Sequence, residues 1–275
     1  MTDQQTRAAR FRALHTAAAP LVLANAWDAA SARIVAATGA KAVATTSAGV
    51  AWTLGAPDGD ALSREAMLEH LARVVAAVPD GVPVTADVET GFGATPDEVA
   101  VTVRGVLAAG AVGVNLEDTV RAGGARLRDI PEQAERIAAA RAAAGAAGVD
   151  LYINARVDTY LRGGGTVEST AERAAAFLAA GATGVFVPGV ADPETIAALV
   201  AAIPAPLNVL AQPGTPPVAE LARLGVARVS LGSWVAEAAY TVARRAAEEA
   251  QGEGTFTALA GAIGYGELNA MMSNG

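Results

Sequence analysis

Eight short apolar runs, rich in β-branched residues, recur along this chain of 275 residues, and alanine-rich stretches separate most of them. Runs of this length and composition predict buried strands. Alanine has the highest intrinsic helix propensity, so the stretches between the runs are predicted to be helices. The predicted strands are Leu21–Asn25, Ala42–Thr46, Val82–Val88, Gly113–Leu116, Leu151–Ala155, Gly184–Val187, Leu207–Leu210 and Arg228–Leu231.

Helix boundary signals support this alternation. Thr95-Pro96-Asp97-Glu98 and Ser169-Thr170-Ala171-Glu172 each predict a capping box at a helix N-terminus. Glycines such as Gly39, Gly110 and Gly181 follow predicted helices, where a left-handed backbone ends the helix.

Strands that alternate with helices predict a parallel sheet. Eight strands without an internal change of composition favour a closed eight-stranded βα barrel of the TIM type, forming one domain over residues 1–275. A helical segment at about 251–275 is expected to extend from it. A doubly wound sheet of the flavodoxin or Rossmann type is the alternative, but no G-x-G-x-x-G follows the first strand and there is no P-loop.

Composition excludes several classes of function. The chain has no cysteine, which rules out disulfides, thiolate metal sites and a cysteine nucleophile or acid. Its net charge is −8 and its basic residues are dispersed, so nucleic acid is not expected as a partner. The N-terminus lacks the apolar segment of a signal peptide, and no apolar run approaches the ~20 residues that cross a bilayer. We therefore expect a cytoplasmic enzyme or binding protein.

Acidic side chains follow two consecutive predicted strands at their carboxyl ends, where βα barrels carry their working residues. Asp87 and Glu89 end the third strand. Side chains alternate between the two faces of a strand with a period of two, so both point to the same side. Glu117 and Asp118 end the fourth strand. A divalent cation, a shared proton or a basic side chain must neutralise such a cluster, and oxygen-only ligands favour Mg²⁺, with Mn²⁺ as the alternative. Ordinary loop polarity is the competing interpretation.

Other strand ends carry groups that suit an anionic ligand. Arg156 ends the fifth strand and could grip a substrate carboxylate, or it could simply pair with Asp158 or another acid at the barrel rim. Thr46 and Ser47 follow the second strand and could hold a carboxylate or carbonyl oxygen, or only form a turn. The seventh strand supplies Asn208.

Two other kinds of catalysis are not expected. His15 and His70 fall in predicted helices away from any strand end, so both are predicted to be structural or surface residues, and no Ser-His-Asp triad assembles. Lys41, the only lysine, begins the second strand at the opposite face of the barrel, which argues against Schiff-base chemistry.

Several motifs, in order and spacing, resemble the isocitrate lyase / phosphoenolpyruvate mutase superfamily over most of the chain. The motifs are Asn25 to Arg33, Thr46 to Asp58, Asp87-Val88-Glu89-Thr90-Gly91-Phe92-Gly93, Leu116-Glu117-Asp118, Asn154-Ala155-Arg156-Val157-Asp158, and Asn208 with Thr215-Pro216. The resemblance implies an eight-stranded barrel and a Mg²⁺-bound 2-oxo acid or its enolate. It also implies that a C–C or P–C bond next to that group is cleaved or formed.

The resemblance also implies roles for individual residues. Asp87 would ligate the metal, and Glu89 and Glu117 would hold it directly or through waters. Asp58 would lie near the metal or the reacting group, and Asp58, Glu117 and Arg156 are the candidate catalytic residues. The residues implied to bind substrate are Asp87, Arg156, Thr46, Ser47, Ala48 and Asn208.

The chain departs from the superfamily in specific places. The cysteine lyases carry Lys-Lys-Cys-Gly-His after the fourth strand, where this chain has Thr119 to Asp129 without a cysteine. The segment 119–130 could still be a lid, with hinges at Gly123 and Gly124 and an arginine (121, 126 or 128) closing over an anion, or it could be a solvated basic loop. After Asn208 the chain also lacks the Thr-Glu of the lyases, so its specificity is expected to differ.

The C-terminal stretch Phe256–Met272 resembles helices that superfamily members exchange between subunits, so a homo-oligomer, a dimer or tetramer, is expected. Packing on its own barrel is the alternative.

The sequence therefore predicts a Mg²⁺-dependent lyase that acts on a small 2-oxo or hydroxy carboxylate through a metal-stabilised enolate, as a decarboxylase or retro-aldol enzyme. One alternative is P–C chemistry, as in phosphonopyruvate hydrolase or the phosphoenolpyruvate and carboxyphosphonoenolpyruvate mutases. A non-catalytic binder of dicarboxylates is the alternative from a different class.

Overall fold

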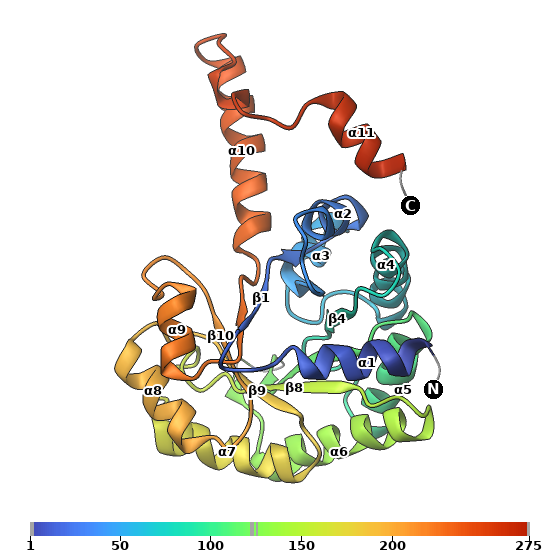
Figure 1. Ribbon diagram of the computed structural model, residues 1–275, viewed down its shortest axis with the longest axis vertical. Helices are drawn as coiled ribbons and strands as arrows, with labels where there is room; N and C mark the ends of the chain where they lie inside the picture. The colour runs from blue at the N-terminus through green and yellow to red at the C-terminus, as the bar shows by residue number, and fades with distance from the viewer. Residues whose placement is uncertain (1–2, 122–123, 125, 274–275) are drawn as a thin grey trace.

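The computed structural model describes residues 3–121, 124 and 126–273, and in these residues nine strands form one parallel sheet that curves into a barrel (Figure 1). Their order around the barrel is β1-β11-β10-β9-β8-β5-β4-β3-β2. The strands are β1 (Leu21–Leu23), β2 (Asn25–Ala26), β3 (Val43–Thr45), β4 (Val84–Asp87), β5 (Gly113–Glu117), β8 (Tyr152–Arg156), β9 (Gly184–Val187), β10 (Leu207–Leu210) and β11 (Arg228–Ser230).

The barrel closes through its first two strands, which are separated by the single residue Ala24. β1 pairs with β11, and β2 pairs with β3. The Asn25 side chain joins the two neighbours, because Nδ2 donates to the Thr45 carbonyl at 2.8 Å and Oδ1 accepts from the amides of Leu231 and Gly232 at 3.1 and 2.9 Å. The predicted TIM-type barrel is confirmed. The sheet has nine strands rather than eight because the first predicted strand is divided at Ala24.

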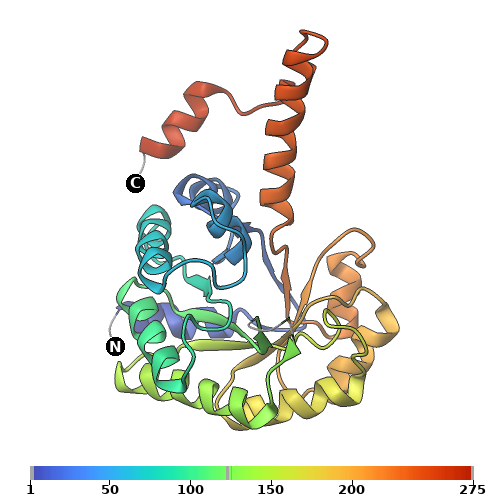
Figure 2. The same cartoon turned by 180° about the vertical axis from the view of Figure 1, so that it is seen from behind.

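Helices cover the outside of the barrel in the order that the sequence predicts (Figures 1 and 2). An antiparallel pair, β6 (Thr119–Val120) and β7 (Arg126–Leu127), follows β5. The barrel helices are α1 (Asp3–Ala13), α2 (Ala29–Ala37), α3 (Ser47–Thr53), α4 (Arg64–Ala77), α5 (Pro96–Ala108), α6 (Ile130–Ala146), α7 (Val167–Ala179), α8 (Pro193–Ala202) and α9 (Val218–Leu224).

One of the two predicted capping boxes is confirmed. Thr95 caps α5 and Glu98 bonds back to it, with Pro96 in the first turn. The second prediction was wrong by three residues. α7 begins at Val167, and its cap is Thr166, whose side chain accepts from the Ser169 amide. Ser169 therefore lies inside the first turn, because a threonine three residues earlier already satisfies the free amide.

An aromatic cluster fills the end of the barrel where α1 lies against β8. We call Phe11, His15 and Tyr152 the aromatic plug. The His15 ring stacks on Tyr152 with centroids 3.9 Å apart, and Phe11 meets both rings edge-on. Burial lowers the pKa of His15 to about 3, so its ring is neutral. His15 is thus a buried structural residue.

The C-terminal helices form an arm that leaves the barrel. α10 (Trp234–Gln251) projects outward, and after the 3₁₀ turn η1 (Thr257–Leu259) the chain returns to α11 (Tyr265–Ser273) beside α2 (Figures 1 and 2). Arg33 of α2 donates to the Met271 carbonyl at 3.1 Å. Along α10 only Ala236 is buried. No helix within the described ranges is both long and apolar enough to span a membrane.

Candidate active site

A cavity of about 160 Å³ opens at the carboxyl ends of the barrel strands, and we call it the main cavity. It is lined by six of the residues that the sequence predicts for the site: Thr46, Ser47, Ala48, Asp58, Asp87 and Arg156. Glu89, Glu117 and Asn208 lie outside this lining. The structure therefore brings together the predicted substrate-binding turn, one metal-ligand candidate and the guanidinium.

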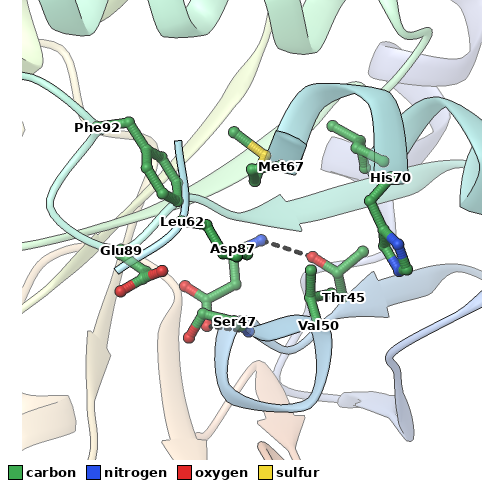
Figure 3. Close-up of a pocket in the computed structure, with 10 residues that line it drawn as sticks. Thr45, Ser47, Val50, Leu62, Met67, His70, Asp87, Glu89 and Phe92 are labelled. Carbon is green, nitrogen blue, oxygen red and sulfur yellow. Dashed lines mark hydrogen bonds between the residues drawn. The ribbon is translucent and has the colours of Figure 1, made fainter. Parts of the chain in front are cut away.

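A second, enclosed space adjoins the main cavity, and we call it the small pocket. Its volume is about 10 Å³, room for roughly one water molecule. Figure 3 shows Asp87, Glu89 and Ser47 at one end of it and His70 at the other. His70 was predicted to lie away from the strand ends, but α4 packs so that its ring reaches this pocket. Its Nε2 lies 2.7 Å from the Trp27 carbonyl, which holds the ring in place.

Asp87, the last residue of β4, lines both spaces. Its backbone amide donates to Thr45 Oγ1 at 2.9 Å (Figure 3), and its Oδ2 accepts from the Ser47 amide at 3.2 Å. Burial raises the pKa of this carboxyl, and the charge of Arg156 opposes the rise. A cation beside Asp87 would therefore favour its ionised form.

Glu89 lies in the turn after β4, so the period of two that predicted its direction does not apply. Its φ is +49°, and Asp60 and Phe92, in the same pair of facing loops, have φ of 58° and 50°. These are the non-glycine residues with positive φ in the described part of the chain, and such conformations gather at functional sites. Glu89 accepts from the Asp60 amide. Burial raises its pKa to about 8, with the Asp60 and Asp58 charges adding to the shift.

A buried arginine that the sequence analysis missed holds this turn. Arg136 of α6 is fully buried and donates to the carbonyls of Thr90, Gly93 and Ala94 at 2.5, 2.8 and 3.0 Å. Thr90 Oγ1 in turn donates to Asp60 at 2.5 Å, so the two loops are tied together. Nothing in the local sequence marks Arg136, which lies in the middle of a helix, 42 to 46 residues away from its acceptors.

Glu117 ends β5 and pairs with two guanidinium groups. Its Oε2 lies 2.8 Å from Arg156 Nη1, and its Oε1 accepts from Arg121 Nη2 at 2.9 Å. Burial raises its pKa to about 7, while the Arg156 charge opposes the shift. In this structure Glu117 thus orients Arg156 from behind the main cavity.

Arg156 pairs with Asp158, as one interpretation of the sequence predicts, and its contact with a substrate carboxylate stays a prediction. Its Nε donates to Asp158 Oδ1 at 2.6 Å, and the same guanidinium lines the main cavity. Although burial opposes its charge, Glu117, Asp158 and Asp87 raise the pKa of Arg156, so it stays a cation. Two carboxylates, Glu117 and Asp158, therefore hold a positive charge in place at the cavity.

The segment 119–130 is described only in part, and the predicted hinge Gly123 lies outside the described residues. Among the arginines predicted to close over an anion, Arg121 faces the acids of the mouth, because its Nη2 is also 3.9 Å from Asp58 Oδ2. Arg128 pairs with Glu132, and Arg126 bonds to the Leu127 carbonyl. That this segment is a lid stays a prediction.

Asn208 is placed below the main cavity rather than in its wall. It is fully buried, and its Nδ2 donates to Ser230 Oγ at 3.2 Å. Two other asparagines line the cavity, Asn25 of β2 and Asn115 in the middle of β5, and Asn115 was not among the predicted site residues. Sequence reasoning considered only strand ends and therefore missed it.

The wall opposite the acids is apolar. Leu161, Phe186, Pro188 and Leu210 line the main cavity there. Arg156 is the sole cation among the lining residues within the described ranges, and its carbon Cζ lies 6.0 Å from the centre of the Phe186 ring. The cavity therefore has a charged side and an uncharged side.

The donors fit a hard divalent cation that keeps part of its water shell. Among the described side chains, no three acids or histidines converge closely enough to enclose a metal alone. Mg²⁺ commonly binds through one or two carboxylates, waters and substrate oxygens, so a complete protein cage is not required. Asp87, whose charged form burial disfavours, offers a carboxylate to the main cavity, and Glu89 lies within reach of the same small pocket.

Comparison with known proteins shows which family and which relatives the sequence resembles. The family model described as phosphoenolpyruvate phosphomutase matches residues 11–251. An uncharacterised protein of Mycobacterium tuberculosis is 38% identical over 264 residues, covering 95% of both chains. The 2-methylisocitrate lyase of Escherichia coli is 32% identical over 181 residues, which cover 64% of this chain and 60% of the lyase.

Solved structures share the fold over nearly the whole length. A Burkholderia cenocepacia protein, provisionally described as a lyase/mutase, superposes with a TM-score of 0.90 at 41% identity, covering 98% of this chain and 96% of that one. An oxaloacetate acetylhydrolase bound to the inhibitor 3,3-difluorooxalacetate gives a TM-score of 0.86 at 27% identity, covering 98% and 93%.

Proposed function

We propose that this chain, which belongs to the phosphoenolpyruvate phosphomutase family, is a Mg²⁺-dependent lyase that cleaves a C–C bond beside the carbonyl or hydroxyl carbon of a small carboxylate. The observation that carries the proposal is the main cavity itself. It holds a metal-suited carboxylate, Asp87, and an obligate cation, Arg156, in one space of about 160 Å³. A cavity of that size suits a ligand about as large as benzene or somewhat larger.

The chain's own residues would bind and orient the substrate. Arg156 presents its guanidinium to a substrate carboxylate, and its pairing with Glu117 and Asp158 limits its motion. Ser47, at the start of α3, offers a hydroxyl beside Asp87 to a second oxygen. A small acid held at both ends has a fixed position, so the bond that breaks has a defined orientation in the cavity.

Asp87, with Glu89 and Glu117 nearby, would hold the magnesium ion, and Mn²⁺ suits the same oxygen donors. When bound, the ion supplies Lewis-acid stabilisation of enolate charge. Since the chain has no cysteine, the proton must pass through another group. The Asp58 side chain lines the main cavity and is about one-third exposed, so it faces both the cavity and solvent and is our candidate for that role.

The apolar wall favours C–C over P–C chemistry. A phosphonate or a third carboxylate pointing at Leu161, Phe186 and Leu210 would lose hydration, and the one cation that lines the cavity in the described chain, Arg156, is already assigned to the first carboxylate. The P–C alternative is supported by the description of the matching family model. A binder of dicarboxylates without turnover is the remaining candidate, and it needs only the charged side of the cavity.

The exposed arm supports a homo-oligomer, a dimer or tetramer, in which α10 and α11 pack on a second copy. Phe256 and Tyr265 are 68% and 84% exposed, which is unfavourable for large aromatic side chains in an isolated chain. Molecular mass in solution, measured for the full chain and for a chain ending at residue 251, tests this part of the proposal. An unchanged mass after truncation would refute the exchange.

A substrate panel tests the reaction. Oxaloacetate, phosphonopyruvate and 2-alkylmalates are incubated with the protein and Mg²⁺, and with a chelator in place of Mg²⁺. We expect turnover of a C–C substrate that stops on chelation, detected by proton NMR of the products, and no loss of phosphonopyruvate by phosphorus NMR. Phosphonopyruvate turnover would select the P–C alternative, and tight oxalate binding without any turnover would select the binder.

A further inference from the structure

The floor of the main cavity carries an amide whose orientation is fixed from below. Asn115 lines the cavity, and its side-chain Oδ1 accepts from Asn154 Nδ2 at 2.9 Å and from Arg228 Nη2 at 3.3 Å. A guanidinium has donors but no acceptor, so the atom of Asn115 that faces Arg228 must be the carbonyl oxygen. The amide therefore cannot flip without losing both bonds.

This orientation leaves Nδ2 as the polar atom that Asn115 offers to the cavity. Within the described chain, no hydrogen bond uses this group. Asn25 lines the same cavity and makes a useful contrast, since its Nδ2 and Oδ1 are both engaged by the barrel backbone. Two asparagines thus face one cavity. The side chain of Asn25 is bonded to the barrel backbone through both Nδ2 and Oδ1, whereas in the described chain Asn115 is bonded only through Oδ1.

Arg228 makes this donor stronger. It is fully buried, and in the described part of the chain no carboxylate lies within ion-pair distance of it. Its Nε donates to Ser230 Oγ at 3.2 Å, and Ser230 also lines the cavity. The positive charge of Arg228, next to Asn115 Oδ1, polarises the amide. Hydrogen bonds linked in series reinforce one another where the dielectric constant is low. Burying an unpaired cation is costly, so a use for it is expected.

We propose that Asn115 is a substrate-binding residue whose Nδ2 donates to an anionic oxygen of the ligand, a carboxylate or enolate oxygen, and that Arg228 is the positioning residue that holds and polarises it. The ligand class rests on the proposed function. The inference adds a third contact point, on the floor, to Arg156 and Ser47 on the walls. With three contacts, a small acid can bind in one orientation only, so each face of its carbon skeleton lies against a defined wall of the cavity.

Oxalate binding, measured by titration calorimetry on the full-length protein with Mg²⁺, tests the inference. Asn115→Leu keeps the approximate volume and removes the donor, so oxalate should bind about tenfold to a hundredfold more weakly, the range for a hydrogen bond to a charged group. Asn115→Asp keeps an acceptor for Asn154 and Arg228, so it should fold, yet its carboxylate offers no donor and repels the ligand. Arg104→Leu, at an exposed position of α5, is the matched control and should bind as wild type does.

The role of Arg228 has its own readout. Arg228→Met releases the amide and should weaken oxalate binding although Nδ2 is still present, whereas Arg228→Lys keeps a donor and a charge and should restore part of the affinity. A purely structural role predicts that the two variants differ in thermal unfolding but not in oxalate affinity once both are folded.

The outcomes separate this inference from the function it rests on. If wild type binds oxalate and both folded Asn115 variants bind equally well, the floor contact is refuted and the proposed function stands. If wild type binds no oxalate with or without Mg²⁺, both are refuted. Weak binding by both Asn115 variants together with rescue by Arg228→Lys supports the proposal.

Discussion

Both ends of the barrel bury ionisable groups, but one end is open to a ligand and the other is sealed by aromatic rings. At the mouth, burial raises the pKa of Asp87, Glu89 and Glu117, yet the mouth is open to a ligand and arginines lie beside it. At the other end, burial lowers the pKa of His15, and the rings of the aromatic plug seal the site. The same desolvation cost can be offset by a bound cation at the mouth but is permanent in the plug. This difference marks the mouth as the end built to bind.

The largest effect should come from removing the charge of Asp87. Asp87→Asn is expected to lower turnover roughly a thousandfold, because it removes the proposed metal ligand and the transition-state stabilisation that would depend on it. Thermal unfolding in the absence of Mg²⁺ should stay the same or shift upward, since a carboxylate that burial disfavours is gone. Asp97→Asn, on exposed α5, is the control. Equal turnover in both variants would remove the distinction between the two ends.

The plug should show the reverse pattern. Phe11→Ala deletes a fully buried ring and is expected to lower the free energy of unfolding by about 3–5 kcal/mol. Substrate affinity in the folded fraction should not change, because the plug lies at the far end of the barrel. Chemical denaturation and oxalate titration of the same sample measure both. A large loss of affinity with intact folding would show that the ends are coupled.

Magnesium should raise the free energy of unfolding by binding at the mouth of the barrel, and the aromatic plug should play no part in this gain. A cation at 100 times its dissociation constant adds about 2.7 kcal/mol to unfolding. We expect this gain for wild type and for Phe11→Ala, and its loss in Asp87→Asn. Denaturation with and without Mg²⁺ measures it, with Ca²⁺ as a test of selectivity. An equal gain in Asp87→Asn would locate the cation elsewhere.

Counted per pH unit, the smallest effect is that of pH on stability. The folded-state pKa of His15 is lowered to about 3 from 6.5, so between these values the unfolded chain binds a proton that the folded chain does not. Stability should therefore fall as pH drops from about 6.5 toward 3, by at most about 1.4 kcal/mol per pH unit. The comparison is with His15→Gln, which lacks this titration. Parallel stability curves for the two proteins from pH 4 to 7 would contradict the assignment of a buried neutral ring.

Strand ends were the most reliable guide to the site. Asp87 and Arg156 are the last residues of β4 and β8, so recognising the strands was enough to bring them to one cavity. Asn208 is only the second residue of β10, and its side chain points into the barrel below the cavity, where Ser230 binds it. A difference of two positions along a strand separates the cavity wall from the barrel interior.

Contacts across long sequence distances could not be predicted. Arg136 holds a loop more than forty residues away, and Arg228 orients Asn115 across 113 residues. In the sequence each is an arginine in an otherwise ordinary helix or strand. The positive φ of Glu89 was equally invisible, because a glutamate in a sequence predicts no left-handed backbone.

The sequence by itself determined the alternation of strands and helices, the barrel and the acids at its mouth, because those follow from local periodicity and from the fixed direction of parallel strands. Tertiary structure alone decided which acids face a cavity and which hold Arg156, that the opposite wall is apolar, and that the Arg228 guanidinium lies under the floor, bonded to Asn115. The physical reason is that a side chain's charge state and bonding depend on what surrounds it in space. For these residues, the surroundings come from distant parts of the chain.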